Sequence, residues 1–434
     1  MNNKKVLAIL LSLVFVFSIT FSLAACGGGS APATSGTGTS ESGTGSTDTG
    51  SGDTILVGRV VPLTGFLASF GVGSPDVEQK AIDEINADGG IFIEEYGAQV
   101  PIKLITYDSE SDPTKASEAA TKLITQDKVN VMTGSHTPLT VNPVSATAER
   151  YQMPCVTVEA PSDPWFGESD HYWSFHVGFT FDMFATVMVD MWDKLDTNKV
   201  VGLLMDNQDG AATRQPVIDE AEARGYTIVD PGLITVGTND YTSMINQFKA
   251  AGVEIITGNM NLPDFSTCWN QFQQADYIPK IVAIGRAALF PDNAATIGTE
   301  YLSTEIWWTP TAPYTSDLFG ISATELSNWY EQTTGEQTSA VIGYKYANME
   351  ILIDALKRAG TLDAQTLRDT IAATDLNTVI GHITYNELQY CEPMLMGGQW
   401  VVSADGKWTQ NIVANTFNPL VPLSDTPMTA LIGS

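Results

Sequence analysis

Short apolar runs alternate along the chain with segments that have the spacing of amphipathic helices. Ile55 to Val61 is apolar and rich in β-branched residues, as is typical of a strand buried on both faces. A polar turn follows, and residues 74–88 then keep a helical spacing of apolar positions. The same succession recurs as far as residue 158 and again over residues 199–284. This alternation predicts two mostly parallel sheets with helices on both faces.

The last third of the chain has a different pattern, because its helical segments follow one another without intervening strands. Such helices must pack on an existing sheet, so we predict that the chain returns to the first lobe and then crosses back. The predicted fold class is therefore α/β, with two Rossmann-like lobes. The predicted first lobe comprises residues 54–178 and 309–380, and the second comprises residues 179–308 and 381–434.

The N-terminal segment has the features of an export signal. Two lysines precede the apolar run 6–21, and the small residues before Cys26 complete the pattern of a secretory signal peptide over residues 1–25. The run is too short for a transmembrane span. The tetrapeptide LAAC resembles the bacterial lipobox, which predicts that Cys26 is lipidated; the alternative is a secreted chain with a free cysteine. Residues 26–53 are mainly Gly, Ser, Thr, Ala and Pro, as expected of a flexible tether.

Composition and motifs exclude several classes of function. The chain has 50 acidic and 21 basic residues, a formal net charge of −29, which argues against nucleic acid and anionic headgroups as partners. No nucleophile elbow, zinc-protease helix, dinucleotide fingerprint or phosphate loop occurs, so we expect no enzyme activity, no cofactor and no metal. Cys155, Cys268 and Cys391 are far apart in the sequence. Three buried thiols are favoured over one disulfide.

Several segments in order resemble a known family. PLTG after the first strand is followed by EINADGGI, DSESDPTKASEAATKLI and VNVMTGS, and later by YKYANMEILIDALKRAGTLDAQTLRDTIAATD before GHITY. Together they are similar to the leucine/isoleucine/valine-binding type of solute-binding protein of ABC transporters. The resemblance covers roughly residues 54–415 and implies two lobes joined by three crossovers that close on a small ligand. It also implies an extracytoplasmic, monomeric body, lipid-anchored at the outer face of the cytoplasmic membrane, with permease subunits as partners.

The resemblance places part of a ligand site on the first lobe. Amino-acid binders of the family hold a carboxylate there with hydroxyls and backbone groups, and an aromatic side chain commonly covers the ligand. The corresponding positions are Phe70 for the aromatic, then Ser135, His136 and Thr137, and finally Glu159 and Ala160. Pro138 occupies a place where a serine is usual, and Ala and Thr are usual where Glu159, Ala160 and Pro161 stand.

The second lobe departs further from the family pattern. Asp209 lies where a tyrosine is common, and Asn259 begins a segment that replaces another aromatic region. The position of the acid that binds the ammonium group aligns with Arg286. An arginine cannot bind an ammonium group, but its planar fork suits a carboxylate. We therefore favour an organic or aromatic carboxylate as ligand.

Other interpretations stay open at this point. An amino acid held by Glu159 or Asp209, an amide, or another polar solute is an alternative ligand, and a ligand-sensing lipoprotein is an alternative function. Arg286 would then pair with Asp206 or Asp209, and His136 would only cap a helix. If Arg286 anchors the ligand, Arg286→Ala is expected to abolish binding while leaving the melting temperature nearly unchanged. For Trp307 and Trp308, packing at a hinge or core is favoured over a stacking platform.

Overall fold

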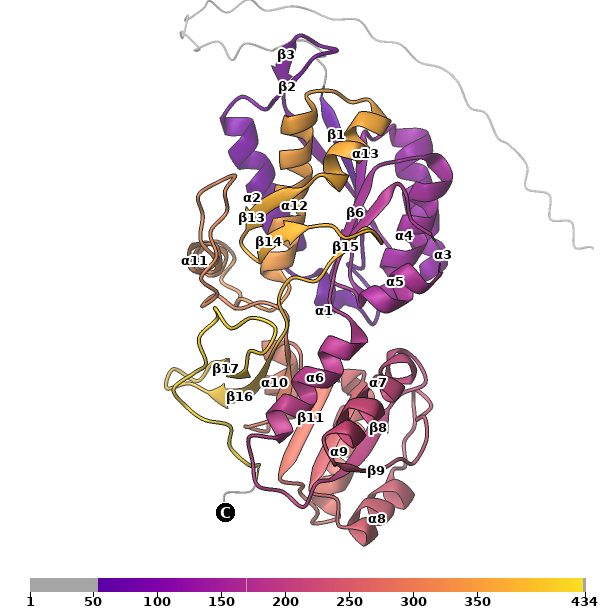
Figure 1. Ribbon diagram of the computed structural model, residues 1–434, viewed down its shortest axis with the longest axis vertical. Coiled ribbons are helices and arrows are strands. Elements are labelled where there is room, and N and C mark those ends of the chain that lie inside the picture. The colour runs from indigo at the N-terminus through magenta and orange to yellow at the C-terminus, as the bar shows by residue number, and fades with distance from the viewer. Residues whose placement is uncertain (1–53, 169, 432–434) are drawn as a thin grey trace, which may run out of the picture. The chain divides into compact units, whose positions relative to one another are not determined.

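The computed structural model describes residues 54–168 and 170–431 of the 434-residue chain. The predicted signal peptide, Cys26 and almost all of the tether lie outside the described residues. Two sheets, each covered by helices, make up the described part (Figure 1).

The first sheet has six strands in the order β15-β7-β6-β5-β1-β4, and all neighbouring strands are parallel. β1 lies inside the sheet, with Val57 opposite both Leu104 and Val131. Its apolar residues are buried on both faces, as the continuous apolar run predicts. The strands are β1 (Ile55–Val61), β4 (Ile102–Asp108), β5 (Val131–Ser135), β6 (Cys155–Val158), β7 (Ser174–Val177) and β15 (Tyr390–Cys391).

Helices cover both faces of this sheet. α12 is buried along almost its whole length and contacts α2 and β6, while α3 and α4 contact each other (Figure 1). The Asp112 side chain caps α3 by accepting a hydrogen bond of 2.9 Å from the Lys115 amide. The helices are α1 (Ala68–Gly71), α2 (Ser74–Ala87), α3 (Pro113–Lys122), α4 (Thr137–Tyr151), α5 (Ser162–Glu168), α11 (Ala323–Thr334), α12 (Ile342–Ala359) and α13 (Ala364–Ala372). Two hairpins complete this lobe: β2 (Ile91–Ile93) with β3 (Ala98–Val100), and β13 (Asp375–Thr378) with β14 (Gly381–Thr384).

The second sheet has seven strands in the order β17-β16-β12-β11-β10-β8-β9. The strands β8 to β12 pair in parallel, and the antiparallel strands β16 and β17 extend one edge of the sheet. The strands are β8 (Val200–Met205), β9 (Thr227–Val229), β10 (Ile255–Met260), β11 (Ile281–Arg286), β12 (Ser303–Ile306), β16 (Met396–Val402) and β17 (Trp408–Ala414). The helices are α6 (Phe181–Trp192), α7 (Asp209–Ala223), α8 (Thr242–Ala251), α9 (Leu262–Gln274) and α10 (Pro291–Ile297).

The chain passes between the two lobes three times: after β7, after β12 and after β15. The third crossing differs from the predicted boundary at residue 381. Tyr390 and Cys391 still pair with β7 of the first sheet, and Met396 is the first residue that pairs with β12 of the second. A short edge strand added to β7 therefore delays the crossing to the segment after Cys391.

Buried side chains pack where the chain crosses between the two lobes. The Trp308 indole donates a 2.9 Å hydrogen bond to the Val379 carbonyl, and the Tyr344 hydroxyl donates one of 3.3 Å to the Met394 carbonyl. Gly343 lies against the Trp308 ring so closely that a Cβ there would be 2.5 Å from it. Trp308 is thus a packing residue, as predicted, and Tyr344 is another.

Three further properties concern the described residues alone. Cys155, Cys268 and Cys391 are buried and free. Within residues 54–168 and 170–431, no His, Cys, Asp and Glu side chains are grouped so that they could hold a metal ion. No helix in these ranges has both the length and the hydrophobicity needed to cross a bilayer.

Candidate functional site

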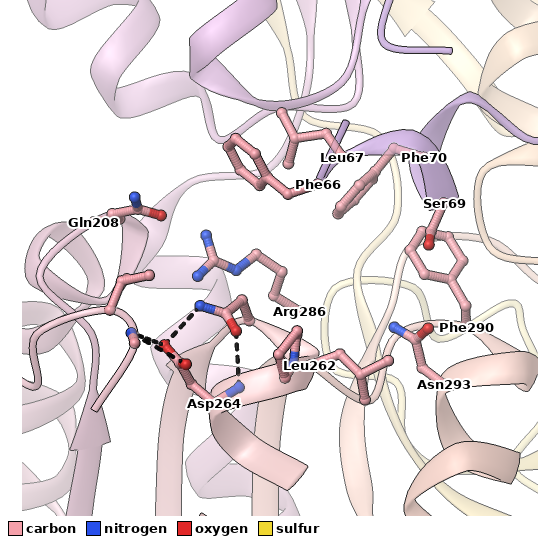
Figure 2. A pocket seen from close by; sticks show the side chains of 14 residues that line it. Phe66, Leu67, Ser69, Phe70, Gln208, Leu262, Asp264, Arg286, Phe290 and Asn293 are labelled. Atoms are coloured by element: carbon pink, nitrogen blue, oxygen red, sulfur yellow. Dashed lines mark hydrogen bonds between the residues drawn. The ribbon is translucent and has the colours of Figure 1, made fainter. Parts of the chain in front are cut away.

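Two adjoining cavities lie between the lobes, where the carboxyl ends of strands from both sheets meet. The outer chamber has a volume of about 500 Å³ and the inner chamber about 40 Å³. The outer chamber is lined by Phe66, Leu67, Ser69, Phe70, Gln208, Val236, Gly237, Asn261, Leu262, Pro263, Asp264, Arg286, Phe290 and Asn293 (Figure 2). The inner chamber is lined by Phe70, Thr137, Pro138, Glu159, Pro161, Phe179, Phe184, Asp209, Thr213, Asn259, Arg286, Glu305 and Trp307.

The backbone is strained at several of the strand ends that form this site. His136 and Thr137 have φ angles of +72° and +54°, Glu159 has +66° and Arg286 has +60°. Residues other than glycine rarely adopt this left-handed conformation, which costs free energy. Its occurrence directly after β5, at β6 and at the end of β11 is typical of sites where the chain is held in place for binding.

A group of charged side chains is fully buried behind the first-lobe edge of the site. Arg59 Nη1 lies 2.7 Å from Glu78 Oε2, in ion-pair contact although not aligned as a hydrogen bond. His136 Nδ1 contacts Glu159 Oε2. Burial raises the pKa of Glu159 to about 8, despite opposing charge from Lys345, and burial also lowers the pKa of His136 well below its usual value. The Glu159–His136 pair is therefore mainly uncharged at neutral pH.

Lys345 connects this buried group to the ligand-facing loop. Its ammonium group, on α12, donates hydrogen bonds of 2.7 Å to the carbonyls of Phe70 and Val72. Burial lowers the pKa of Lys345 to about 8, while Glu159 opposes that shift. A buried side chain from the last third of the chain thus fixes the backbone on either side of Gly71.

The Phe70 ring is held within an aromatic cluster. It stacks on Trp307 at a centroid distance of 6.0 Å and meets the edge of Phe290 at 5.0 Å. Its ring also lies 6.0 Å from the His136 ring. Phe70 lines both chambers, so its ring forms part of the partition between them.

The second-lobe edge of the site carries an arginine between two carboxylates. Arg286 Nη1 donates a 2.5 Å hydrogen bond to Asp209, and Nη2 pairs with Asp206. Asp206 is buried and also accepts backbone hydrogen bonds, whereas the Asp209 side chain is 27% exposed. Both arms of the fork are therefore engaged, as the alternative interpretation of Arg286 anticipated.

A second polar contact fixes the loop beside Arg286. Asn261 caps α9 by accepting a 2.9 Å hydrogen bond from the Asp264 amide, and its own amide group donates one of 2.9 Å to Asp264 Oδ2. The Asp264 carboxylate also accepts from the Gly237 amide at 3.0 Å, so it ties the loop at 237 to the start of α9 (Figure 2).

Several buried polar atoms of the inner chamber have no hydrogen-bond partner. They come from both lobes: Thr137 Oγ1, Glu159 Oε1, Asn259 Oδ1 and Arg286 Nε. Buried polar groups in folded proteins are nearly always paired, and an exception requires an explanation such as water or a ligand. Four such atoms around one space indicate a place where a polar group binds.

The structure brings most of the predicted site residues to one place. Phe70, Thr137, Glu159, Asp209, Asn259 and Arg286 all line the inner chamber. Ser135, His136 and Ala160 are buried beside it and are not part of its lining. His136 occupies the N-cap position of α4, but its side chain makes no capping hydrogen bond.

The outer chamber was hardly indicated by any pattern in the sequence. Trp307, for which packing was favoured, lines the inner chamber and stacks on Phe70. Phe66 follows the first turn and lines the outer chamber, and its side chain is 62% exposed, which the sequence does not reveal. Nothing in the sequence places it in one chamber with Phe290, because the two residues come from different lobes.

The comparisons with known proteins agree on one family. The family model for periplasmic binding proteins matches residues 54–389. The Leu/Ile/Val-binding protein homolog 7 of Brucella abortus is 24% identical over 415 residues, covering 90% of this chain and 94% of that protein.

Two solved structures share the fold. The branched-chain amino acid substrate-binding protein LivJ of Streptococcus pneumoniae, in complex with isoleucine, has a TM-score of 0.68 at 21% identity and covers 83% of this chain and 100% of its own. A solute-binding protein of an ABC transporter from Rhodopseudomonas palustris, in complex with 3,4-dihydroxybenzoic acid, has a TM-score of 0.66 at 18% identity. The match covers 83% of this chain and 96% of that one.

The chain therefore belongs to the periplasmic binding protein family, in its type I form that resembles branched-chain amino acid-binding proteins. The predicted α/β fold with two lobes and parallel sheets is confirmed. The family consists of extracytoplasmic solute-binding proteins of ABC transporters rather than enzymes.

Proposed function

We propose that this periplasmic binding protein captures a small organic solute between its lobes by hinged closure and delivers it to the permease subunits of an ABC importer. The observation that supports this most directly is the set of buried polar atoms without partners on residues of both lobes that line one space. A ligand that pairs with atoms of both lobes stabilises the closed arrangement, which is how binding and closure become coupled.

We propose an organic or aromatic carboxylate as the solute. Two acids already pair with Arg286, so a ligand carboxylate would take the place of Asp209, whose side chain is 27% exposed and is the more accessible of the two. Arg286 Nε has no partner and adds a further donor for such a ligand.

An amino acid is less well supported by this geometry. Its ammonium group would require a charged acid, but the pKa of Glu159 is raised by burial to about 8, so this carboxyl is mainly protonated at neutral pH. The other candidate, Asp209, is already paired with Arg286. A relative that binds isoleucine therefore does not determine the ligand here.

A thermal-shift screen followed by calorimetry tests the proposal. The panel contains amino acids, aromatic acids, dicarboxylates and amides, since a ligand that binds only the folded state raises the melting temperature. We expect an acid to bind and to be recovered unchanged after incubation. Thr137→Val removes an unpartnered hydroxyl with little change in shape and should weaken that binding about 5–30-fold. Chemical conversion of the solute would contradict the proposed function.

Membrane attachment completes the proposal. Cys26 is proposed to carry the lipid anchor, and the body to act as a monomer on a flexible tether. In cells, Cys26→Ser should release the protein from the membrane fraction while the purified body keeps its affinity for the solute.

A further inference from the structure

We infer that the outer chamber is the subsite for the body of the ligand, so that the solute is an extended, amphipathic acid with a planar aromatic body rather than a compact one. This inference rests on the proposed function and adds the size and shape of the solute. The ligand's polar end would reach Arg286 at the inner chamber, and its apolar part would lie in the outer chamber.

The two volumes support this division. A water molecule needs roughly 10–15 Å³ of cavity volume, so the 40 Å³ of the inner chamber hold about three waters. A carboxylate group fits there, but a whole amino acid does not. The outer chamber, at about 500 Å³, is within the range of pockets that bind organic ligands.

The lining of the outer chamber suits a planar apolar body. Phe66 and Phe70 extend from the first-lobe turn on one side, and Leu262 and Phe290 lie on the other (Figure 2). The Phe70 and Phe290 rings meet at 87°, one of the arrangements that aromatic pairs prefer, and both line the chamber that the ligand's ring would enter. A bound aromatic body would cover Phe66, whose side chain is 62% exposed.

Two residues determine the orientation of the ligand. Phe70 and Arg286 line both chambers, so a molecule that passes from one to the other runs between an aromatic ring and a guanidinium group. The acid group then meets Arg286 and the unpartnered Thr137 hydroxyl, while the ring points outward. Gln208 and Asn293 supply polar groups for a hydroxyl substituent on that ring.

The test compares an extended acid with a compact solute by calorimetry. The probes are 4-hydroxycinnamate and isoleucine, and the variants are Phe66→Ala, which removes the exposed wall, and Leu262→Trp, which fills the outer chamber. Phe92→Ala is the matched control, because Phe92 is 52% exposed and does not line the chamber. We expect 4-hydroxycinnamate to bind, with affinity reduced about 5–20-fold by Phe66→Ala and at least about tenfold by Leu262→Trp. Phe92→Ala should change it less than about twofold.

The outcomes separate this inference from the proposed function. If only isoleucine or other compact solutes bind, and neither chamber variant alters their affinity, the outer subsite is overturned while the proposed function stands. If no member of the wider panel of acids, amino acids and amides binds, both are overturned. Melting temperatures of the variants within a few degrees of the unmodified protein show that any lost affinity is not lost folding.

Discussion

The two edges of the cleft differ in how far their charged side chains are buried. Behind the first-lobe edge, Arg59, Glu78 and Lys345 are each 1% exposed or less and line neither chamber. On the second-lobe edge, the side chains of Arg286 and Asp209 are 11% and 27% exposed and face the chambers. One edge has charges that solvent and ligand cannot reach, and the other has charges that they can.

Because of this difference, the first-lobe edge holds the backbone of the site in place, and the second-lobe edge can exchange its contacts. Buried charges are costly unless they are paired, and removing one partner leaves the others uncompensated. The first-lobe edge is therefore a fixed wall: Lys345 holds the backbone around Phe70 whatever the ligand does. The partly exposed Asp209–Arg286 pair contributes little to stability and can open at low cost. We infer that the second lobe supplies the adjustable contacts.

The largest effect is expected for Lys345→Met. The substitution removes two hydrogen bonds to the carbonyls of Phe70 and Val72 and leaves Glu78 and Glu159 with less opposing charge. We expect the free energy of unfolding to fall by about 3–5 kcal/mol, measured by urea denaturation. Solute affinity should fall as well, because the Phe70 loop loses its anchor.

Lys357→Met on the same helix is the control for this prediction. Lys357 is exposed near the end of α12, so its loss should change stability by less than about 0.5 kcal/mol. Equal effects of the two substitutions would show that Lys345 has no special role in the first-lobe wall.

The second prediction concerns Arg286→Ala and corrects an expectation from the sequence. A nearly unchanged melting temperature is no longer expected, since Asp206 is buried and loses its counter-charge. Asp206 keeps backbone hydrogen bonds from Gln208 and Gly210, at 3.0 and 2.9 Å, which limits the loss to about 2 kcal/mol. Denaturation of the unliganded protein measures this loss of stability. The variant should also lose its binding of an acid.

Arg214→Ala provides a matched control for Arg286. Arg214 pairs with Asp230 away from the chambers, and its side chain is 34% exposed, so about 0.5 kcal/mol or less is expected. Asp209→Asn should likewise leave stability almost unchanged. If Arg286→Ala lowers the free energy of unfolding no more than Arg214→Ala does, the buried charge of Asp206 does not need Arg286 as its counter-charge.

The sequence predicted the fold best where patterns are local. The apolar run Ile55–Val61 and the helix expected over residues 74–88, which corresponds to α2, were located to within a few residues. β7 and β12 were not predicted, because each has four residues and reads SFHV and STEI, with buried polar side chains in place of an apolar run. Short strands of this kind are defined by their neighbours in the sheet.

The candidate site was predictable only in part, for a related reason. Positions directly after strands, such as Thr137 and Glu159, could be located because parallel strands bring their carboxyl ends together. The sequence could not show which of these side chains face the cavity. His136, for example, turns toward Glu159 instead. The engagement of Arg286 by two carboxylates depends on tertiary contacts that no local pattern encodes. The same holds for the presence of Phe66 and Phe290 in one chamber.

The smallest effect is a change in the pH dependence of stability. Burial raises the pKa of Glu159 from 4.5 to about 8, so the folded state binds a proton that the unfolded state releases in this range. Stability from this group is complete below pH 4.5 and is lost as the pH rises toward 8. Glu78, whose pKa is raised to about 7, acts in the same direction, whereas His136 acts in the opposite direction below 6.5.

Glu159→Gln isolates this contribution, because glutamine keeps the shape and a hydrogen-bonding group next to His136 but does not titrate. Between pH 5 and 8, the free energy of unfolding of the variant should fall less than that of the unmodified protein. Denaturation curves across that range measure the difference. The exposed Glu118→Gln on α3 should keep the original slope. A variant at Glu159 with the same slope as Glu118→Gln would mean that this carboxyl is already ionised in the folded protein, and the first-lobe wall would then carry a charge that an ammonium group could use.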